Sequence, residues 1–582
     1  MMTGTLIFGN GPIGDRGGQK TLRWRRFGVG SSPRAVVISR DMKVVRSMSK
    51  DATATPGDDN PKASMGKRMG MAAIILSVSI FLSRILGFLR EAVIAYTHGA
   101  GTTTDAYYAA FQLPDLMNYF LAGGALSITF IPLFSSYIAK NDEEGAWRLF
   151  STIASTMGVA LVGMTIAGWL LAPWFVSVFF AGFDDPNQVD LTVTMTRIVI
   201  PAQLGFYFGG LIQGALFVRE VFWPSAVAPL IYNLCIILGG VLLEPFVGIQ
   251  GFAIGVVIGA LLGPFLVPLW AIRKELKFRF RFRPLDKDFK KFVALTIPLM
   301  IGVSLVTVDE WFLRYFGSMQ EEGAITWLTY GRKMMLVVFA VIGQAAGQAA
   351  LPYLSRLYHE GKKAEMGQML AQSLQRVSFL SMVGMVGLIA AAFPLIYLVF
   401  YRGQFTATDA DITAWLLCWF ALGLASWNIQ TLAVRGFYAM KDTLTPMIVG
   451  TVTVALSFPF YYFFNQQFGT VGLAAATSVG ITINAIATLA VYRWRAGALP
   501  LRPIGAGLAR GLMHGLVAGA AAGAVYWLWS PESLAMGLLP LVGLNVAMGA
   551  AFFAALGLTT WWLEPPEMEV VWRRVRAKVP FL

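Results

Sequence analysis

Charged residues are scarce in this 582-residue chain, in which only 13% are Asp, Glu, Lys or Arg. A soluble domain usually carries about 25% charged residues. Here 56% of the residues are hydrophobic, and the mean hydropathy is +0.62. Apolar runs of roughly 20 residues recur along nearly the whole length, each enough to cross a hydrocarbon core about 30 Å thick. These runs exclude a soluble globular protein and are too long and glycine-rich for barrel strands, so we predict an all-α polytopic membrane protein.

Ligands for metals and redox chemistry are also rare. Cys235 and Cys418 stand alone in separate apolar segments, which indicates small core residues rather than a disulfide or a metal pair. His98, His359 and His514 lie far apart, and the sequence has no P-loop to cradle a phosphate. We therefore expect no cofactor and no ATP hydrolysis by this chain.

Positive charge is in excess, with a net charge of +14 at pH 7. Residues 1–64 are rich in Gly, Arg and Ser, so we expect a disordered basic extension there. Most of the other Lys and Arg residues lie in short loops between apolar runs. This placement favours contact with anionic phospholipids and argues against nucleic acid as a partner.

Fourteen membrane spans are predicted from the apolar runs. Lys and Arg gather in every second loop, whereas the other loops hold mainly acidic residues such as Asp184, Glu321 and Asp409. By the positive-inside rule, both termini are cytoplasmic. The predicted spans are residues 71–97, 105–138, 149–181, 190–217, 223–244, 249–272, 292–316, 325–357, 367–400, 410–438, 443–464, 469–492, 507–529 and 536–562.

The two halves of the chain resemble each other. GALFVREVFWP at 214–224 matches GFYAMKDTLTP at 436–446, and FLR occurs at both 88–90 and 312–314 with a similar offset. A repeat of six spans relates the halves by an axis along the membrane normal, which predicts two pseudo-symmetric six-helix lobes around a central cavity. The predicted domains are the extension 1–64, the N-lobe 65–273, a basic cytoplasmic loop 274–291, the C-lobe 292–493, two C-terminal spans 494–563 and a cytoplasmic tail 564–582.

Several predicted spans contain charged residues, each of which costs at least about 2.5–3.5 kcal/mol at the bilayer centre. In the first span Arg84 and Glu91 share a helix face, while Arg90 points about 120° away in an ideal helix. The candidate ligand-binding residues are Ser83, Arg84, Arg90, Asp105, Arg332 and Lys333; the candidate gating ion pairs involve Glu91, Glu310 and Arg314; the candidate ion ligand is Asp309.

These cations outnumber the carboxylates that are expected to face inward, so positive charge is left over for a ligand. An arginine side chain can bind two phosphate oxygens at once, which favours an anionic ligand such as a phosphate ester. An alternative interpretation is that the charges form structural ion pairs that hold helices together.

Three segments resemble one family of transporters. SRILGFLREAVIAYTHGAGTTTDAYYAAFQLPDL (83–116), GQFTATDA (403–410) and GFYAMKDTLTP (436–446) are similar to the MurJ/MviN family of lipid II flippases, in the multidrug/oligosaccharidyl-lipid/polysaccharide exporter superfamily. The likeness covers residues 70–565. It implies a V-shaped pair of lobes, alternating access, and transport of lipid II from the inner to the outer leaflet of the bacterial cytoplasmic membrane for peptidoglycan synthesis. It also implies a transporter rather than an enzyme.

The resemblance assigns roles to several residues. In the family, cations of the cavity bind the pyrophosphate of undecaprenyl-linked lipid II, and Arg84, Arg90 and Asp105 occupy matching positions. Lys333 stands where the family has an arginine, which keeps the charge but loses the second hydrogen-bonding arm. The C-terminal spans within 494–563 would form a groove for the polyprenyl tail. We further expect a monomer, with the peptidoglycan synthesis machinery as a candidate partner.

The sequence also departs from the family pattern. Asn118 replaces an arginine and Gly123 replaces a glutamate, and these two positions are paired in some members. Some members bind sodium around spans seven, eleven and twelve, where Asp309 is the only attractive ligand in this chain. Span eleven (443–464) has no carboxylate in its interior, which argues against sodium coupling by that route.

Two other functions remain open from the sequence. A relative in the same superfamily could carry another polyprenyl-linked glycan or a cationic drug, although a drug antiporter should have an acidic cavity. A membrane enzyme acting on polyprenyl-phosphate sugars would need carboxylates near a membrane face, and only the pair Asp309–Glu310 qualifies.

Overall fold

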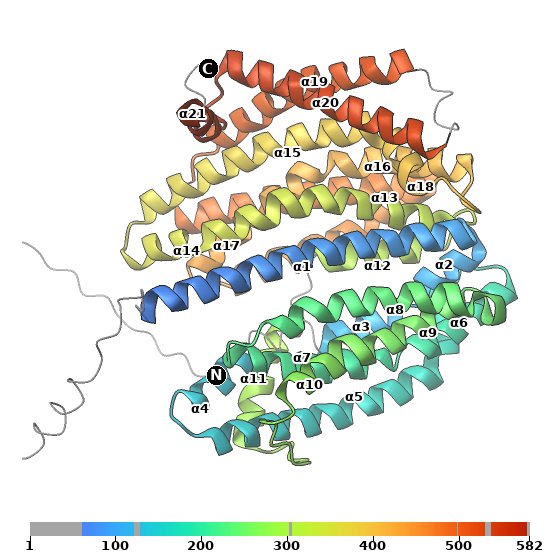
Figure 1. Cartoon of the computed structure of the whole chain (residues 1–582), viewed down its shortest axis with the longest axis vertical. Coiled ribbons are helices and arrows are strands. Elements are labelled where there is room, and N and C mark those ends of the chain that lie inside the picture. Colours follow the sequence, from blue (N-terminus) through green and yellow to red (C-terminus); the bar gives the residue numbers. More distant parts are fainter. Residues whose placement is uncertain (1–60, 122–128, 302–304, 498, 530–536, 579–582) are drawn as a thin grey trace, which may run out of the picture. The chain divides into compact units, whose positions relative to one another are not determined.

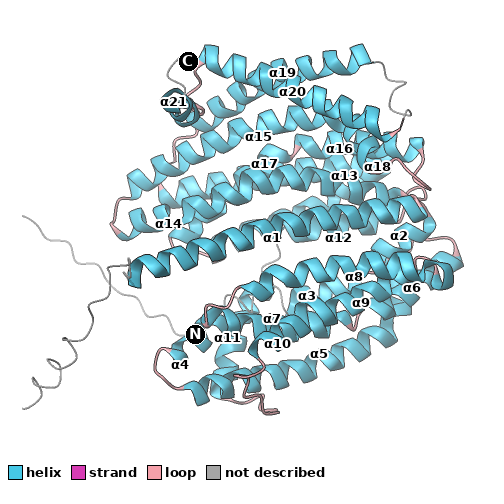
Figure 2. Cartoon of the chain, viewed as in Figure 1, coloured by secondary structure: helices cyan, strands magenta, loops and turns pink. Residues whose placement is uncertain are grey.

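The computed structural model describes residues 61–121, 129–301, 305–497, 499–529 and 537–578. Throughout these ranges the regular secondary structure is helical, which confirms the predicted all-α class (Figures 1 and 2). The predicted extension 1–64 lies outside the described residues, except that residues 61–64 form the start of the first helix.

The first half of the chain ends near residue 272 and contains ten α-helices and one π-helical turn within the described ranges. Long helices alternate with pairs of shorter ones that follow each other closely. The elements are α1 (Pro61–His98), α2 (Thr102–Ala109), α3 (Gln112–Leu121), α4 (Ile131–Ile138), α5 (Glu143–Phe179), α6 (Pro186–Val199), α7 (Ala202–Val218), α8 (Trp223–Val247), α9 (Gln250–Ala260), η2 (Leu261–Leu266) and α10 (Val267–Ile272).

The second half of the chain and the C-terminal region also consist of long helices and shorter ones. In Figure 1, α15, α19 and α20 lie next to one another on one side, and the three pack together. The elements are α11 (Lys287–Ile301), α12 (Leu305–Gly317), α13 (Ala324–Phe339), η3 (Ala340–Gln344), α14 (Ala345–His359), α15 (Lys363–Val399), α16 (Ala407–Leu422), α17 (Leu424–Ala439), α18 (Leu444–Ala496), α19 (Arg502–Trp529), α20 (Leu538–Leu563) and α21 (Glu569–Lys578).

The described helices are those of a membrane-spanning protein. Nine helical stretches among the described residues are long and apolar enough to cross a bilayer, or ten when the bent pair α16 and α17 is taken as one span. Large apolar side chains such as Leu170, Phe246 and Trp562 are exposed on their surfaces. Exposure of so much apolar area to water would cost about 25 cal/mol per Å², so this surface is suited to lipid.

Equivalent helices in the two halves have matching lengths and breaks. Helices α5 and α15 each contain 37 residues. Gly248, which follows α8, has φ 56° and ψ −140°, and Gly469 inside α18 has φ 56° and ψ −139°. Because side chains strain a backbone with positive φ, glycine suits both positions. The break at Gly469 divides α18 into the predicted spans 443–464 and 469–492.

The span predicted at 292–316 packs against both halves of the chain. Its first part, α11, contacts α3 and α5. In addition, Tyr137 of α4 donates a hydrogen bond to Asp288 of α11 at 2.7 Å. Its second part, α12, packs on α18, where the ring of Phe312 lies 5.1 Å from that of Tyr461. The span therefore links the first half of the chain to the second.

Candidate functional site

A chamber of about 630 Å³ lies among α1, α3, α12 and α13. Its wall is mixed in character, with amide, aromatic, acidic and basic side chains facing one space. The lining residues are Arg84, Asp115, Asn118, Tyr119, Glu310, Trp311, Arg332, Leu336, Phe339, Ala340 and Gln344.

Arg84 has no carboxylate partner in the described part of the chain. Its side chain is exposed, and its Nη2 donates a hydrogen bond to Oε1 of Gln344 at 3.2 Å. An amide oxygen carries only a partial charge, so the positive charge of Arg84 is not neutralised. Among the sequence-predicted residues, Arg84 is therefore the one best placed to bind an anion in the chamber.

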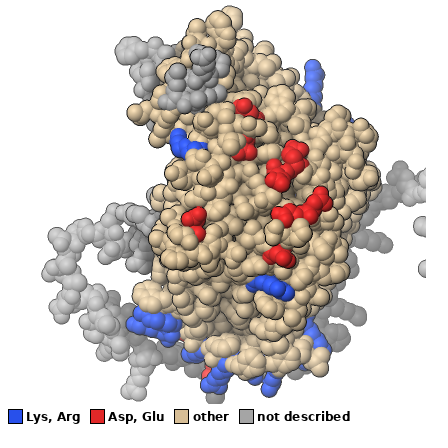
Figure 3. Space-filling view, turned by 90° about the vertical axis from the view of Figure 1, so that its right-hand side faces the viewer, with Lys and Arg blue, Asp and Glu red and all other residues tan. Residues whose placement is uncertain are grey.

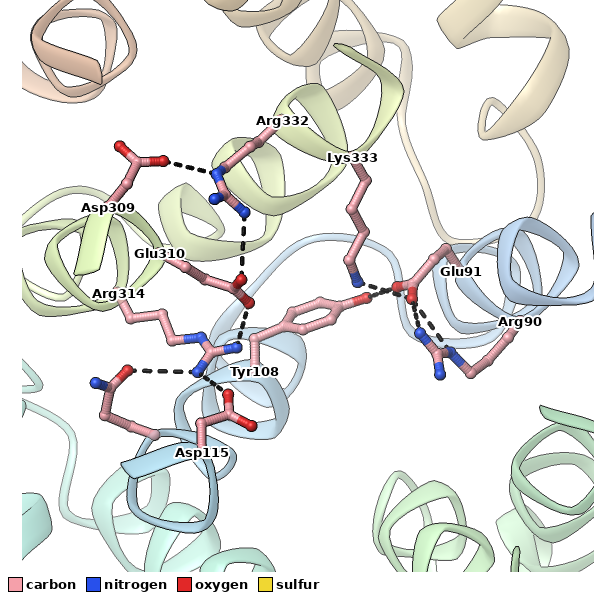
Figure 4. Close-up of polar contacts among 10 residues, drawn as sticks. Arg90, Glu91, Tyr108, Asp115, Asp309, Glu310, Arg314, Arg332 and Lys333 are labelled. Carbon is pink, nitrogen blue, oxygen red and sulfur yellow. Dashed lines mark hydrogen bonds and ion pairs between the residues drawn. The ribbon is translucent and has the colours of Figure 1, made fainter. Parts of the chain in front are cut away.

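A first ion-pair cluster is centred on Glu91, which is 3% exposed (Figure 4). Its Oε1 pairs with Nζ of Lys333 at 2.7 Å and accepts hydrogen bonds from the guanidinium of Arg90. The hydroxyl of Tyr108 donates to Oε2 at 2.5 Å, and Arg90 also donates to Asn233 at 3.2 Å. We call these five residues the Glu91 cluster; it joins α1 to α2, α8 and α13.

A second cluster is centred on Glu310, which is 42% exposed (Figure 4). Its carboxylate binds Arg314 at 2.5 Å and Arg332 at 3.2 Å. Arg314 also pairs with Asp115 at 2.7 Å, and Arg332 with Asp309 at 2.7 Å. We call these five residues the Glu310 cluster; it joins α3 of the first half to α12 and α13 of the second.

The two clusters and Arg84 together hold one more cation than carboxylate. The five cationic groups belong to Arg84, Arg90, Arg314, Arg332 and Lys333, and the four carboxylates to Glu91, Asp115, Asp309 and Glu310. Because a charge within a membrane span demands compensation, this excess favours an anionic ligand.

Asp309 has its carboxylate oxygens occupied by groups of the protein itself. Besides Arg332, the hydroxyls of Tyr461 and Thr477 donate hydrogen bonds to its Oδ1, the latter at 2.8 Å. No group of three or more His, Cys, Asp and Glu residues suited to a metal occurs among the described residues. In this conformation the guanidinium of Arg332 takes the place that a bound cation would need at Asp309.

Asp105 lies outside the lining of the chamber. It is 2% exposed, and its carboxylate accepts hydrogen bonds from the backbone N–H of Gly323 at 2.8 Å and of Thr326 at 2.8 Å. The Thr326 hydroxyl adds a third bond at 2.6 Å. Asp105 thus caps the N-terminus of α13, where a negative charge is stabilised by the helix dipole.

A second contact between the halves lies at the same end of the helices. The backbone N–H of Gln404 donates to the carbonyl oxygen of Tyr96 at 2.9 Å, and Gly403 lies so close that a Cβ would be 2.1 Å from that oxygen. The segment GQFTATDA therefore closes over the end of α1. Together with the Asp105 cap, this contact closes one end of the space between the halves.

Acidic side chains gather at this closed end. Figure 3 shows Asp and Glu over the middle of the face, with most Lys and Arg at its edges. Among the exposed acidic residues of this end are Asp184, Glu321 and Asp411. The centre of this face is therefore richer in Asp and Glu than in Lys and Arg.

Other candidate residues fall in different places. Ser83 is half-buried and accepts a hydrogen bond from Asn233 at 3.5 Å, outside the chamber lining. Asn118 does line the chamber. Gly123 lies outside the described residues. The sequence reasoning missed Asp115, although a carboxylate within the predicted span 105–138 is the same signal that singled out Arg84.

Sequence comparison connects the chain to known proteins. The family model described as Lipid II flippase MurJ matches residues 94–563. A Vibrio cholerae protein named "Probable lipid II flippase MurJ" is 26% identical over 435 residues, which cover 73% of this chain and 82% of that protein. The lipid II flippase MurJ of Burkholderia cenocepacia is 28% identical over 428 residues, or 72% of this chain and 83% of that protein.

Solved structures share the fold. The structure titled "Lipid II flippase MurJ, inward closed conformation" has a TM-score of 0.70 and 22% identity, and covers 84% of this chain and 100% of that chain. An inward-facing multidrug resistance MATE family transporter of the MOP superfamily has a TM-score of 0.60 and 15% identity, covering 73% of this chain and 98% of that one. Because the family model spans most of the sequence, this chain belongs to the lipid II flippase MurJ family.

Proposed function

We propose that this chain translocates lipid II from the inner to the outer leaflet of the bacterial cytoplasmic membrane by alternating access, as a transporter for peptidoglycan synthesis. The observation that carries the proposal is the uncompensated guanidinium of Arg84 in a chamber between the two halves. A guanidinium binds phosphate oxygens through two parallel hydrogen bonds, and lipid II carries a pyrophosphate.

The proposed topology has fourteen spans in two six-helix lobes. To the ten candidate spans of the described residues we add one for the division of α18 at Gly469. Helix α1, the segment α2 to α4 and the segment α11 to α12 supply three more. Helices α19 and α20 follow the repeat and are proposed to hold the polyprenyl tail. Loop charges favour cytoplasmic termini.

Pyrophosphate binding is proposed to proceed by exchange of partners. The ligand first binds Arg84, which has no carboxylate to give up. It then competes with Glu91 for Arg90 and Lys333, which that single carboxylate holds together in the resting arrangement. Release of Glu91 frees α1 from α13 and favours a rearrangement of the lobes.

The membrane potential is proposed as a driving force. Moving two negative charges outward from a negative interior releases about 4–5 kcal/mol at about 100 mV. Sodium at Asp309 is a less favoured source in this chain, because Arg332 already neutralises that carboxylate.

Complementation of a flippase-depleted bacterial strain tests the proposal. Wild type should restore growth, whereas Arg84→Ala should fail and Arg84→Lys should restore it in part. Arg356→Ala is the matched control, because Arg356 is exposed and, among the described residues, its ion-pair partner is Glu360 at the C-terminal cap of its own helix. Equal growth with Arg84→Ala and wild type at equal expression would contradict the role of Arg84.

The alternative of a membrane enzyme receives no support from the geometry. The pair Asp309–Glu310 was its only candidate for acid–base chemistry, and both carboxylates are bound to arginines.

A further inference from the structure

A second, larger pocket lies away from the chamber, at the acidic end of the helices. Its volume is about 820 Å³. The end of α15, the start of α16, the break in α18 and Tyr526 near the end of α19 form its wall. None of its lining residues belongs to the Glu91 or Glu310 cluster. The proposed translocation path therefore leaves this pocket without a role.

Two carboxylates line this pocket, and each is held by a neutral donor. The hydroxyl of Tyr397 donates to Oδ1 of Asp411 at 2.9 Å, and that of Thr470 donates to Oε1 of Glu321 at 3.0 Å. Both acidic residues are exposed, and neither forms an ion pair within the described residues. The hydrogen bonds orient the carboxylates without neutralising them, so the pocket keeps its negative charge.

Aromatic rings supply much of the remaining wall. Tyr397 and Tyr401 lie with their ring centroids 4.9 Å apart, and Phe393, Trp415, Phe468 and Tyr526 complete the aromatic lining. Faces of aromatic rings attract cations, most strongly ammonium groups that have shed part of their water. Rings combined with carboxylates favour an organic ammonium ion over both a simple anion and an apolar molecule.

The position of the pocket suggests the source of such an ammonium group. On α19, Trp527 and Trp529 are 76% and 45% exposed, next to the lining residue Tyr526. Exposed tryptophans at a helix end are typical of the level of lipid headgroups. In the proposed topology this end faces the outer leaflet.

We propose that this pocket binds the ammonium group of an aminophospholipid, such as phosphatidylethanolamine, from the outer leaflet. Asp411 and Glu321 balance its charge, and the rings of Tyr397, Tyr401 and Trp415 surround it. The site is separate from the pyrophosphate chamber, so a bound phospholipid would act as a fixed structural partner rather than as cargo. The leaflet assignment rests on the proposed topology; the ammonium chemistry does not.

Native mass spectrometry of the full-length protein with added lipids tests this site. Wild type should retain phosphatidylethanolamine in preference to phosphatidylglycerol. The double variant Asp411→Asn, Glu321→Gln should bind phosphatidylethanolamine about tenfold more weakly, because it keeps the aromatic rings but removes both carboxylates that balance the ammonium charge. Glu322→Gln is the matched control, because Glu322 is an exposed neighbour outside the pocket lining.

Further measurements distinguish a lipid headgroup from a free ammonium ion as the ligand, and distinguish this binding site from the proposed transport function. Unchanged retention of phosphatidylglycerol by the double variant shows that it is folded. If tetramethylammonium or free ethanolamine stabilises wild type in thermal melting while phosphatidylethanolamine has no preference, the lipid source is wrong. Equal binding of both lipids to wild type and to the double variant would overturn the whole proposal. Arg84→Ala should keep the lipid preference even where complementation fails, so the two proposals can fail separately.

Discussion

At the scale of single residues, the site depends on which cations already have partners. Glu91 serves two cations at once, and Arg84 has only an amide. The sequence singled out these charged residues because ionisable groups are rare in apolar spans. It could not identify their partners, since Glu91 and Lys333 lie far apart in the chain and meet only in the folded structure. Nothing in the sequence indicated that Tyr108 contacts Glu91, because tyrosine is a common residue in membrane spans.

Replacing Glu91 tests the partner exchange. Glu91→Gln should lower the thermal stability, because Arg90 and Lys333 lose a buried carboxylate, and breaking a buried ion pair costs about 3–5 kcal/mol. Inorganic pyrophosphate should raise the melting temperature of the variant more than that of wild type, since it replaces the missing charge. Thermal melting of detergent-purified protein with and without pyrophosphate measures this.

The control for this change is Glu360→Gln, which removes an exposed partner of Arg356. It should leave the response to pyrophosphate at the wild-type value. The same pyrophosphate shift in Glu91→Gln and wild type would show that the ligand does not compete for these cations.

A second residue-scale prediction concerns Asp309. Wild type should show no stabilisation by sodium relative to choline at equal ionic strength, because Arg332 already binds the carboxylate. Arg332→Met removes that cation and should make stability depend on sodium, with a higher melting temperature in sodium than in choline. A clear sodium effect on wild type would contradict the assignment of Arg332 as the internal counter-ion.

At the scale of helices, the sequence predicted which segments form helices better than it predicted which helices contact one another. The hydrophobic runs predicted the long helices, whereas the equivalent backbone breaks at Gly248 and Gly469 emerge only from the structure. Asp105 illustrates the limit of this reasoning. Its motif placed it near the ligand, but the carboxylate instead caps α13, a partner more than two hundred residues away that local patterns do not reveal.

The Asp105 cap should favour closure at the acidic end. A pair of cysteines at Tyr96 and Gln404 should crosslink readily, in a background with Cys235 and Cys418 replaced by alanine, because these backbones are hydrogen-bonded. Asp105→Ala should reduce crosslinking several-fold, since losing an N-cap costs about 0.5–2 kcal/mol. Undiminished crosslinking in Asp105→Ala would show that the cap does not hold this end closed.

At the scale of the whole molecule, the acidic end and the chamber are the two features that bear on the proposed transport. The acidic end in Figure 3 corresponds to the loops that the sequence marks as poor in Lys and Arg. The chamber is lined by helices of both halves of the chain. Its volume and lining depend on side-chain packing across the halves, and for that reason no pattern in the sequence could give them.

Transport of fluorescent lipid II in proteoliposomes, with the membrane potential set by a potassium gradient, tests the central claim most directly. Wild type should flip lipid II faster when the potential favours outward movement of negative charge. Arg84→Ala should lower the rate by at least tenfold at every potential, and Arg84→Lys should retain an intermediate rate, because charge remains but the paired hydrogen bonds are lost. A wild-type rate in Arg84→Ala would contradict the claim that this unpaired cation binds the pyrophosphate.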